Sequence, residues 1–348
     1  METTHTMKRK GEHIRICLNE DVNSEGIDTG LGRYRFIHNA LPEINFSQID
    51  LSTEWLGHQL QTPLLISSMT GGTPETAIIN ERLAKMAEQR GWAIGLGSMR
   101  AALENESVAT TFQIRKYAPS VPIIANIGAV QLNYGVTAAD CLKLVHMAEA
   151  SALVLHLNSM QEVFQPEGDT NFSDLLRKIE QLCHTLKVPV GVKEVGWGID
   201  GRTAAKLVDA GVAFIDVAGA GGTSWSQVEK HRMQDPVRIH AAETFANWGI
   251  ATADSIIDVR EHVPQTFVVA SGGMRSGVDV AKALALGAHL AGFGRTLLKG
   301  AAAENDMIAM EQLQQQFQTI EFELKATMFG IGVASIEELR HTDRIHLR

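Results

Sequence analysis

The densest group of polar side chains in this 348-residue chain is His156-x-Asn158-x-x-Gln161-Glu162. Residues two apart on a strand point to the same face, so His156 and Asn158 should act together. A single carboxylate is a poor metal cage, but it suffices for Mg²⁺ when a substrate brings a diphosphate, because Mg²⁺ keeps waters and phosphate oxygens among its ligands. The group is therefore a candidate catalytic and metal site. The alternative is that Glu162 is only a solvated loop acid.

Glycine-rich turns form a second candidate site. They lie at Gly219–Thr223, Ser271–Gly277 and Gly292–Arg295. Glycine lets backbone N–H groups approach an anion closely, and a helix N-terminus adds a positive dipole. Three such turns favour a phosphate site over the alternative, in which the glycines only make tight turns.

Eight short apolar runs, with helix-like segments between them, must position these side chains. The runs begin at Leu64, Ile94, Ile123, Leu153, Val190, Phe214, Phe267 and Leu290. Apolar runs that alternate with helices indicate a parallel sheet covered on both faces, and eight such units predict an α/β fold of the TIM (β/α)8 barrel type. The carboxyl ends of barrel strands form the active site, so the polar residues after the runs should converge. They are Thr70, Ser98, Asn126, His156, Asn158, Lys193, Thr223, Gly272 and Arg295.

The length fits one barrel domain with an extension at each end. We expect residues 1–62 to form an N-terminal arm and cover, residues 63–300 the barrel core, and residues 301–348 C-terminal helices. Apolar groups between Ile44 and Leu56 predict a small cover over one barrel end. The connections after the fourth and sixth runs are long, and loops of this kind shape pockets or act as lids.

Composition excludes several classes of function. The net charge of −9 argues against binding to nucleic acid or to anionic membranes. We find no apolar run near the roughly 18 residues of a membrane span, and no secretory signal. The three cysteines lack metal-ligand spacing, and their odd number predicts reduced thiols in the cytoplasm.

Cations lie in the N-terminal arm and after the second run. The arm carries Arg9-Lys10-x-x-His13, and Met99-Arg100 follows the second run. Arginine offers bidentate contacts to a phosphate and lysine a point charge. We expect the arm to be flexible and to lie outside the barrel; the alternative to a phosphate-binding role is a solvated basic tail.

A barrel with a phosphate site after its last strands suits flavin mononucleotide (FMN). Lys193 ends the fifth run, where a cation could stabilise negative charge on a reduced flavin. Thr70, Ser98 and Asn126 are neutral hydrogen-bonding groups of the kind that a flavin edge requires. Each of them alone could equally be a satisfied polar cap at a strand end.

Six ordered motifs resemble those of type 2 isopentenyl-diphosphate Δ-isomerases, and the resemblance runs from about residue 8 to the C-terminus. The motifs are Arg9-Lys10-x-Glu12-His13-Ile14, Ser67–Gly72, Gly97–Arg100, His156–Glu162, Gly221–Trp225 and Trp248–Thr252. That family interconverts isopentenyl and dimethylallyl diphosphate. The resemblance implies bound FMN, Mg²⁺, NADPH as the reductant of FMN, and a homo-oligomer, either a tetramer or an octamer.

The resemblance also implies roles for individual residues. FMN contacts are expected at Ser67, Ser68, Met69, Thr70, Ser98, Asn126, Lys193, Thr223, Gly272, Gly273, Met274, Arg275, Ala291 and Gly292. Substrate contacts are expected at Arg9, Lys10, His13, Ser98, Met99, Arg100 and Gln161, and a Mg²⁺ ligand at Glu162. The expected catalytic group is Gln161 with His156 and Asn158. Flavin N5 would carry the proton, and Gln161 would relay it or position the substrate; orientation of the substrate alone is the alternative.

Two other functions compete with this interpretation. An FMN-dependent 2-hydroxy-acid oxidase or dehydrogenase on the same barrel needs a histidine base in an Asn-His-Gly-Gly setting after the sixth strand. The corresponding segment here, Ala218–Gly222, contains no histidine. A non-catalytic flavin- or phosphate-binding protein would leave Asn158, Gln161 and Glu162 without an evident purpose.

Overall fold

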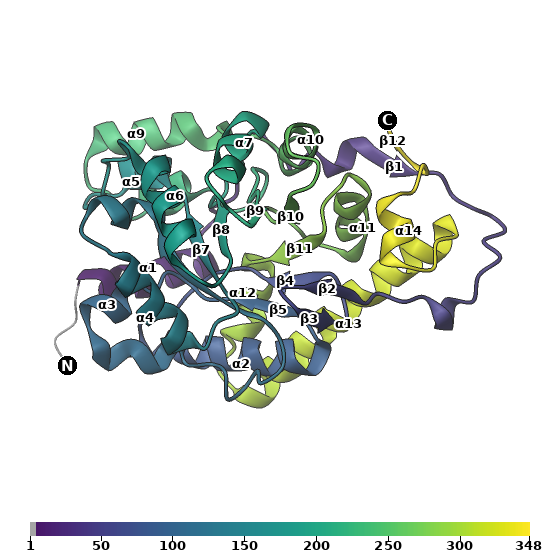
Figure 1. Ribbon diagram of the computed structural model, residues 1–348, viewed down its shortest axis with the longest axis horizontal. Coiled ribbons are helices and arrows are strands. Elements are labelled where there is room, and N and C mark those ends of the chain that lie inside the picture. The colour runs from purple at the N-terminus through teal and green to yellow at the C-terminus, as the bar shows by residue number, and fades with distance from the viewer. Residues whose placement is uncertain (1–4) are drawn as a thin grey trace.

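Eight parallel strands close into a barrel in the computed structural model, which describes residues 5–348. The last strand pairs with the first, Ala291 beside Leu64, so the sheet has no free edge. The strands are β4 (Leu64–Ile66), β5 (Ala93–Gly95), β6 (Ile123–Gly128), β7 (Ala152–His156), β8 (Val190–Lys193), β9 (Phe214–Asp216), β10 (Phe267–Ala270) and β11 (Leu290–Phe293). Each predicted apolar run contributes one strand, and the predicted barrel fold is confirmed (Figure 1).

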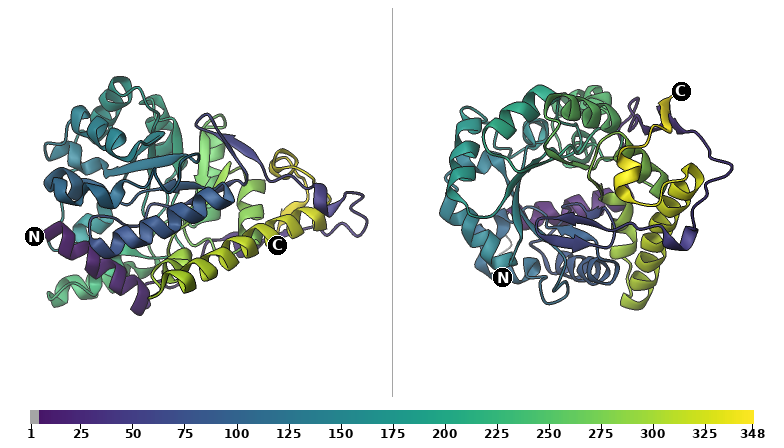
Figure 2. Two further views of the ribbon diagram at one scale, coloured as in Figure 1. Left: turned by 90° about the horizontal axis from the view of Figure 1, so that it is seen from below. Right: turned by 45° about the vertical axis from the view of Figure 1, so that its right-hand side comes forward.

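Helices surround the barrel and cover its outer face (Figure 2). Those along the strands are α2 (Pro74–Arg90), α4 (Ala138–Ala148), α6 (Leu175–Thr185), α7 (Gly201–Asp209), α10 (Thr252–His262), α11 (Gly277–Ala285) and α12 (Arg295–Ala301). Between β5 and β6 the chain forms only the short helix α3 (Arg100–Glu104) and a 3-10 segment, Glu106–Phe112. The helix ends follow local chemistry: Thr73 caps α2 from its side chain, and Gly91 ends it at φ 64°.

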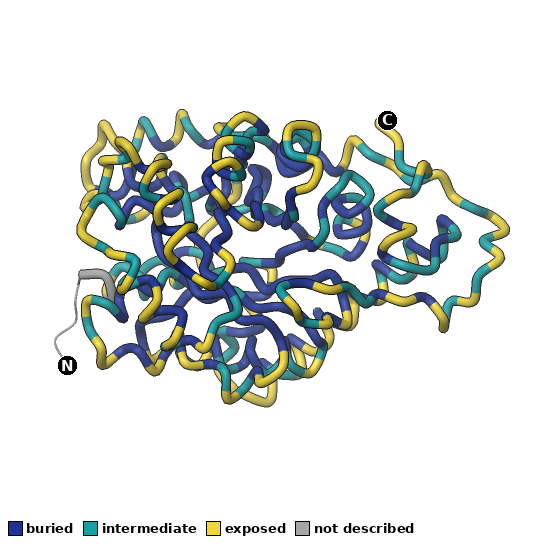
Figure 3. Tube along the Cα trace, viewed as in Figure 1, coloured by how far each residue is buried: buried dark blue, intermediate teal, exposed yellow. Residues whose placement is uncertain are grey.

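The apolar core has two layers, because successive strand residues point to opposite faces. Leu65 and Val154 point into the barrel, whereas Leu64, Ile66 and Leu155 pack against the helices. Buried backbone follows the strands, and exposed residues lie on the outer helix faces and the connections (Figure 3). No helix within residues 5–348 has both the length and the apolar character needed to cross a membrane.

Only part of the predicted cover lies over the barrel. The hairpin β2 (Thr53–Trp55) and β3 (His58–Leu60) places Trp55 against Phe214 and Phe267, with ring centroids 5.2 and 5.5 Å away, at the amino ends of β9 and β10. This hairpin seals the end opposite the carboxyl ends of the strands.

The segment from Ile44 to Leu51 packs elsewhere. Phe46 contacts Phe322 and Phe329 on the long helix α13 (Asp306–Ile331), and Asp50 pairs with Ser335 just before α14 (Ile336–Arg340). Another terminal pairing joins β1 (Tyr34–Phe36) to β12 (Ile345–Leu347). The apolar groups of this segment therefore bury themselves against the C-terminal helices, and the prediction that they cover the barrel is wrong.

Two further expectations need correction. The basic arm is the helix α1 (His5–Asn19) and not an irregular tail. The long connections contain helices: α5 (Ser159–Phe164) follows β7, and α8 (Trp225–Lys230) and α9 (Pro236–Thr244) follow β9. Charged side chains from α1, from the connection after β7 and from the connection after β9 meet over the carboxyl ends of the strands.

Candidate active site

A cavity of about 560 Å³ opens at the carboxyl ends of the strands. It gathers nearly all the residues singled out from the sequence, from α1 at its mouth to the turns after β10 and β11. The predicted residues that line it are Arg9, Lys10, His13, Ser67, Ser68, Met69, Thr70, Ser98, Arg100, Asn126, His156, Asn158, Gln161, Glu162, Lys193, Thr223, Gly272, Gly273, Met274, Arg275 and Gly292.

Met99 and Ala291 lie outside the cavity lining. Both side chains are fully buried in the apolar layer between strands and helices. The Met99 amide donates to the Asn126 carbonyl oxygen at 2.7 Å, which holds the turn after β5 against β6. The expected substrate contact at Met99 and FMN contact at Ala291 therefore stay predictions, and with both side chains buried such contacts would use the backbone.

The glycine-rich turns pack on one another at the cavity wall. Gly272 has φ +102°, and a Cβ there would lie 2.1 Å from the Gly219 carbonyl oxygen. Within residues 5–348 the amides of Gly272, Gly273 and Met274 have no assigned protein acceptor. The glycines thus allow the tight turns and close packing that were the alternative to a phosphate site. They also leave backbone amides that could bind an anion.

Ser67, at the end of β4, supports the fit of a bound group in this cavity. Its hydroxyl oxygen is buried and has no hydrogen-bond partner in the described chain. Buried polar atoms are normally paired, so an unpaired hydroxyl facing a cavity indicates a ligand. The Ser67 hydroxyl and the nearby amides are thus polar groups that a bound cofactor with a phosphate could satisfy.

The orientation of His156 is set by Asn126. The Asn126 amide nitrogen donates to the Leu96 carbonyl oxygen at 3.0 Å, so its Oδ1 faces His156 Nδ1 at 2.9 Å. His156 must therefore donate from Nδ1, which leaves Nε2 as an acceptor. Burial, reinforced by the charge of Lys193, lowers the pKa of His156 to about 3. Near pH 7 the His156 ring is therefore neutral, and its Nε2 accepts a hydrogen bond and carries no proton to give to a substrate.

Lys193 supplies a buried cation at the end of β8. Its side chain is largely buried, and Nζ donates to the Glu194 carbonyl oxygen at 2.5 Å. Burial lowers the pKa of Lys193, while Asp216 and Glu194 oppose that shift. A cation held in a dry wall stabilises negative charge on a neighbouring group strongly.

The carboxylate of Glu162 is held in a fixed orientation on α5. Asn158 Nδ2 donates to Oε1 at 2.7 Å, and the Asp169 amide donates to Oε2, also at 2.7 Å. Burial raises the pKa of Glu162. The described residues contain no cluster of three histidine, cysteine, aspartate or glutamate side chains that could hold a metal alone. A cation here would need further ligands from a substrate or water.

Cations line the cavity mouth near Glu162. Lys10 Nζ donates to the Ser98 carbonyl oxygen at 2.5 Å, and burial, with Arg9 nearby, lowers the pKa of Lys10 to about 7. Arg100 pairs with Glu104 at 2.6 Å and with Asp169 at 2.5 Å. Arg100 is therefore already partly neutralised by the protein.

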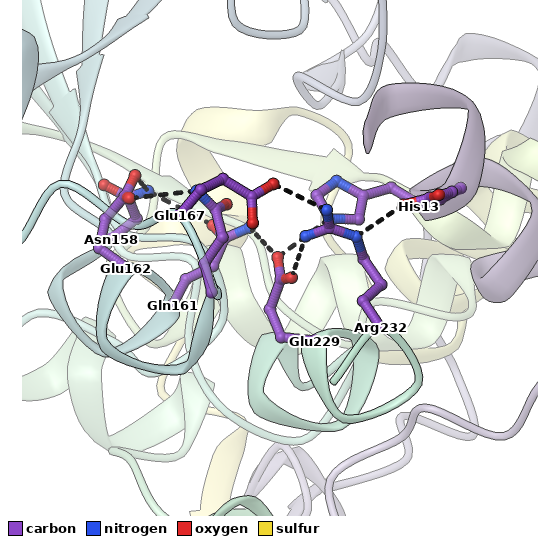
Figure 4. A network of polar contacts seen from close by, with 9 residues as sticks. His13, Asn158, Gln161, Glu162, Glu167, Glu229 and Arg232 are labelled. Carbon is purple, nitrogen blue, oxygen red and sulfur yellow. Dashed lines mark hydrogen bonds and ion pairs between the residues drawn. The ribbon is translucent and has the colours of Figure 1, made fainter. Parts of the chain in front are cut away.

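Sequence reasoning missed a network of charges beside this group. Glu229 on α8 is fully buried, accepts from Gln161 Nε2 at 3.1 Å and lies 2.9 Å from His13 Nε2 (Figure 4). Burial raises the pKa of a carboxyl, but His13 and Arg232 outweigh it and lower the pKa of Glu229 to about 2. The one available signal was the Glu229-x-x-Arg232 spacing, which suits a helix ion pair. Trp225 both lines the cavity and packs edge-on against His13.

Comparisons with known proteins agree on the fold and on the family. The sequence model of the FMN-dependent dehydrogenase family matches residues 127–346. The isopentenyl-diphosphate delta-isomerase of Oceanobacillus iheyensis is 52% identical over 98% of this chain and 96% of its own length. The enzymes of the same name from Nostoc sp. and Rickettsia bellii are 50% and 48% identical, over 98% and 97% of this chain and 96% and 97% of their own lengths.

Solved structures share the architecture at much lower identity. A lactate oxidase from Pediococcus acidilactici superposes with a TM-score of 0.70 at 19% identity, covering 97% of this chain and 90% of its own. An (S)-mandelate dehydrogenase mutant superposes with a TM-score of 0.69 at 19% identity, covering 98% and 96%. At this identity the likeness concerns the barrel fold alone.

Proposed function

The chain belongs to the isopentenyl-diphosphate delta-isomerase family, and we infer from its active site that it interconverts isopentenyl and dimethylallyl diphosphate using bound FMN. The observation that carries this function is the convergence of Asn158, Gln161 and Glu162 with the cations of α1 and the glycine-rich turns in one cavity. The predicted resemblance to the type 2 enzymes is confirmed by the relatives.

The rival hydroxy-acid oxidation lacks its base. In the turn after β9, where that chemistry requires a histidine, the chain has Ala218–Gly222. His156 does not replace it, because it lies on β7 and its pKa, lowered to about 3, makes its ring a very weak base. The segment after β9 serves instead to pack closely on the Gly272 turn.

Isomerisation adds a proton to the terminal alkene carbon and removes one from the carbon next to the diphosphate-bearing carbon. Reduced FMN, when bound, supplies N5 as a proton carrier and an electron-rich ring beside the positive charge that develops. The Lys193 ammonium in the cavity wall would stabilise negative charge on the reduced ring. Helix α1 helps to exclude water from the cavity mouth. Gln161 donates to Glu229, which fixes the orientation of its amide. An amide is a weak base, so we assign Gln161 a relay or positioning role.

The substrate's diphosphate is assigned to the cationic mouth. Arg9, Lys10 and Arg100 surround it, and Ser98 and His13 lie among them. A Mg²⁺ ion joining Glu162 to diphosphate oxygens would need only one carboxylate, as is usual for this ion. The unpaired, buried Asn158 Oδ1 next to Glu162 supports a further polar partner there. The FMN phosphate is assigned to the turns at Gly272–Arg275 and Gly292.

Replacing FMN with 5-deazaFMN tests the proton carrier. The analogue keeps the phosphate and ring contacts, so it should bind with nearly unchanged affinity. Isomerisation should then be lost, because carbon at position 5 does not exchange a proton as nitrogen does. Retained isomerisation by the 5-deazaFMN enzyme would remove N5 from the mechanism.

We further propose NADPH as the reductant of FMN and a homo-oligomer, a tetramer or octamer, as the working assembly. Both rest on the family resemblance. A cytoplasmic location is supported by Cys17, Cys141 and Cys183, which are all free thiols. The net charge of −9 supports a small-molecule partner and argues against nucleic acid or anionic membranes.

A further inference from the structure

Arg232 occupies an unusual position just after α8. Its side chain is only 9% exposed, and it contacts three carboxylates (Figure 4). The guanidinium lies 3.0 Å from Glu12, 2.8 Å from Glu167 and 2.6 Å from Glu229. Each carboxylate comes from a different segment: α1, the connection after α5, and α8. One buried side chain thus joins the three segments that surround the cavity mouth.

The charges explain why this arrangement holds. Burial of a lone ion is costly, but a planar guanidinium can donate to several carboxylates at once. Burial lowers the pKa of Arg232, and its three partners outweigh burial and raise it. Without the guanidinium, the three carboxylates of Glu12, Glu167 and Glu229 would lose their shared counter-charge beside the cavity mouth.

Two of the three carboxylates that Arg232 contacts, Glu12 and Glu229, lie next to predicted active-site residues. Glu12 lies one helical turn from Arg9 on α1, beside His13, which itself contacts Glu229. Glu229 accepts from Gln161 Nε2, so the position of Glu229 sets the orientation of the Gln161 amide. Arg232 holds Glu229 from the opposite side in Figure 4.

We propose that Arg232 is a positioning residue that fastens α1 across the mouth of the active site and fixes Glu229, and through it Gln161. Its role in catalysis rests on the proposed isomerase function, whereas its role as a fastening for α1 does not. Arg232 is not among the residues that line the cavity, so it acts through its three partners.

Trypsin cleavage of the FMN-loaded protein tests the fastening directly. The sites after Lys8, Arg9 and Lys10 lie on α1, and mass spectrometry follows their cleavage. We expect trypsin to cleave α1 at least tenfold faster in Arg232→Met than in the unchanged protein. We also expect 10 mM inorganic diphosphate to slow this cleavage less in Arg232→Met than in the unchanged protein. The matched control is Arg177→Met, which removes an exposed arginine paired with Asp174, and it should leave both readouts unchanged.

Kinetics test the catalytic part. Arg232→Met should raise KM for isopentenyl diphosphate at least tenfold and lower kcat, with FMN affinity unchanged. Adding Glu167→Gln to Arg232→Met removes one of the carboxylates that lost its counter-charge. KM should then fall part of the way back toward the value of the unchanged protein, which a merely structural role would not produce. Arg232→Lys keeps the positive charge but loses the planar guanidinium, so its KM and kcat should lie between those of Arg232→Met and the unchanged protein. The lysine variant replaces Arg232→Met in both tests if the methionine variant does not fold.

Equal trypsin rates for Arg232→Met, Arg232→Lys and the unchanged protein would overturn the fastening of α1. Unchanged KM and kcat in both variants would overturn the catalytic part. If the unchanged protein lacks isomerase activity, the proposed function fails, while the trypsin and diphosphate readouts still decide the role of Arg232.

Discussion

Lys10 should make substrate capture depend on pH near neutrality. Lys10 lies on α1 and its ammonium donates to the Ser98 carbonyl oxygen, and burial with the neighbouring Arg9 lowers its pKa to about 7. A diphosphate binds the charged form, so affinity is present below this pKa and is lost as the pH rises through it. At pH 9 only about 1% of Lys10 would still be charged in the free enzyme, which predicts a fall in kcat/KM of roughly tenfold per pH unit above 7.

The assay is kcat/KM for isopentenyl diphosphate between pH 6 and 9.5, with FMN kept reduced and Mg²⁺ saturating. Lys10→Arg is the control, because a guanidinium stays charged throughout this range and the substrate's own titration is common to both proteins. The ratio of the two profiles should bend near pH 7. Profiles that run parallel over the whole range would show that Lys10 does not titrate there, and the burial argument would be refuted.

Three further substitutions test the Mg²⁺ ligand, the FMN-binding turn and the packing at the amino-terminal end of the barrel, one each. Glu162→Gln should raise the Mg²⁺ concentration needed for isomerisation sharply; an unchanged Mg²⁺ titration would remove Glu162 from the metal. Gly272→Ala puts a Cβ 2.1 Å from a carbonyl oxygen at φ +102°, so fluorescence titration should show weaker FMN binding; unaltered FMN affinity would contradict the role of that turn. Trp55→Ala should lower the free energy of unfolding by about 3–5 kcal/mol in urea titrations and leave FMN affinity unchanged, and a loss of FMN binding would contradict the separation of the two barrel ends.

The strands were predictable because each is a continuous apolar run, and the barrel then places the residue after each run at one face. Asn126, His156 and Lys193 follow that rule and line one cavity. Met99 and Ala291 do not line it. Ala291 lies on the face of β11 that packs against the helices, and Met99, in the turn after β5, is buried in the same layer.

The charge network escaped prediction for a different reason. Glu12, Glu167 and Arg232 are types normally found on the surface, and they are separated by 155 and 65 residues along the chain. Only the fold shows that Arg232 neutralises both carboxylates. The packing of Phe46 on α13 was hidden in the same way, since its partners lie near the opposite end of the sequence.

The most direct test of the central claim is anaerobic incubation of the purified protein with isopentenyl diphosphate, FMN, Mg²⁺ and NADPH, with a parallel reaction lacking the reductant. The product to measure is dimethylallyl diphosphate. We predict that it forms only when FMN is reduced. A protein that binds FMN and reduces or oxidises another substrate, yet forms no dimethylallyl diphosphate in either reaction, would contradict the isomerase function while leaving the barrel and its cofactor site intact.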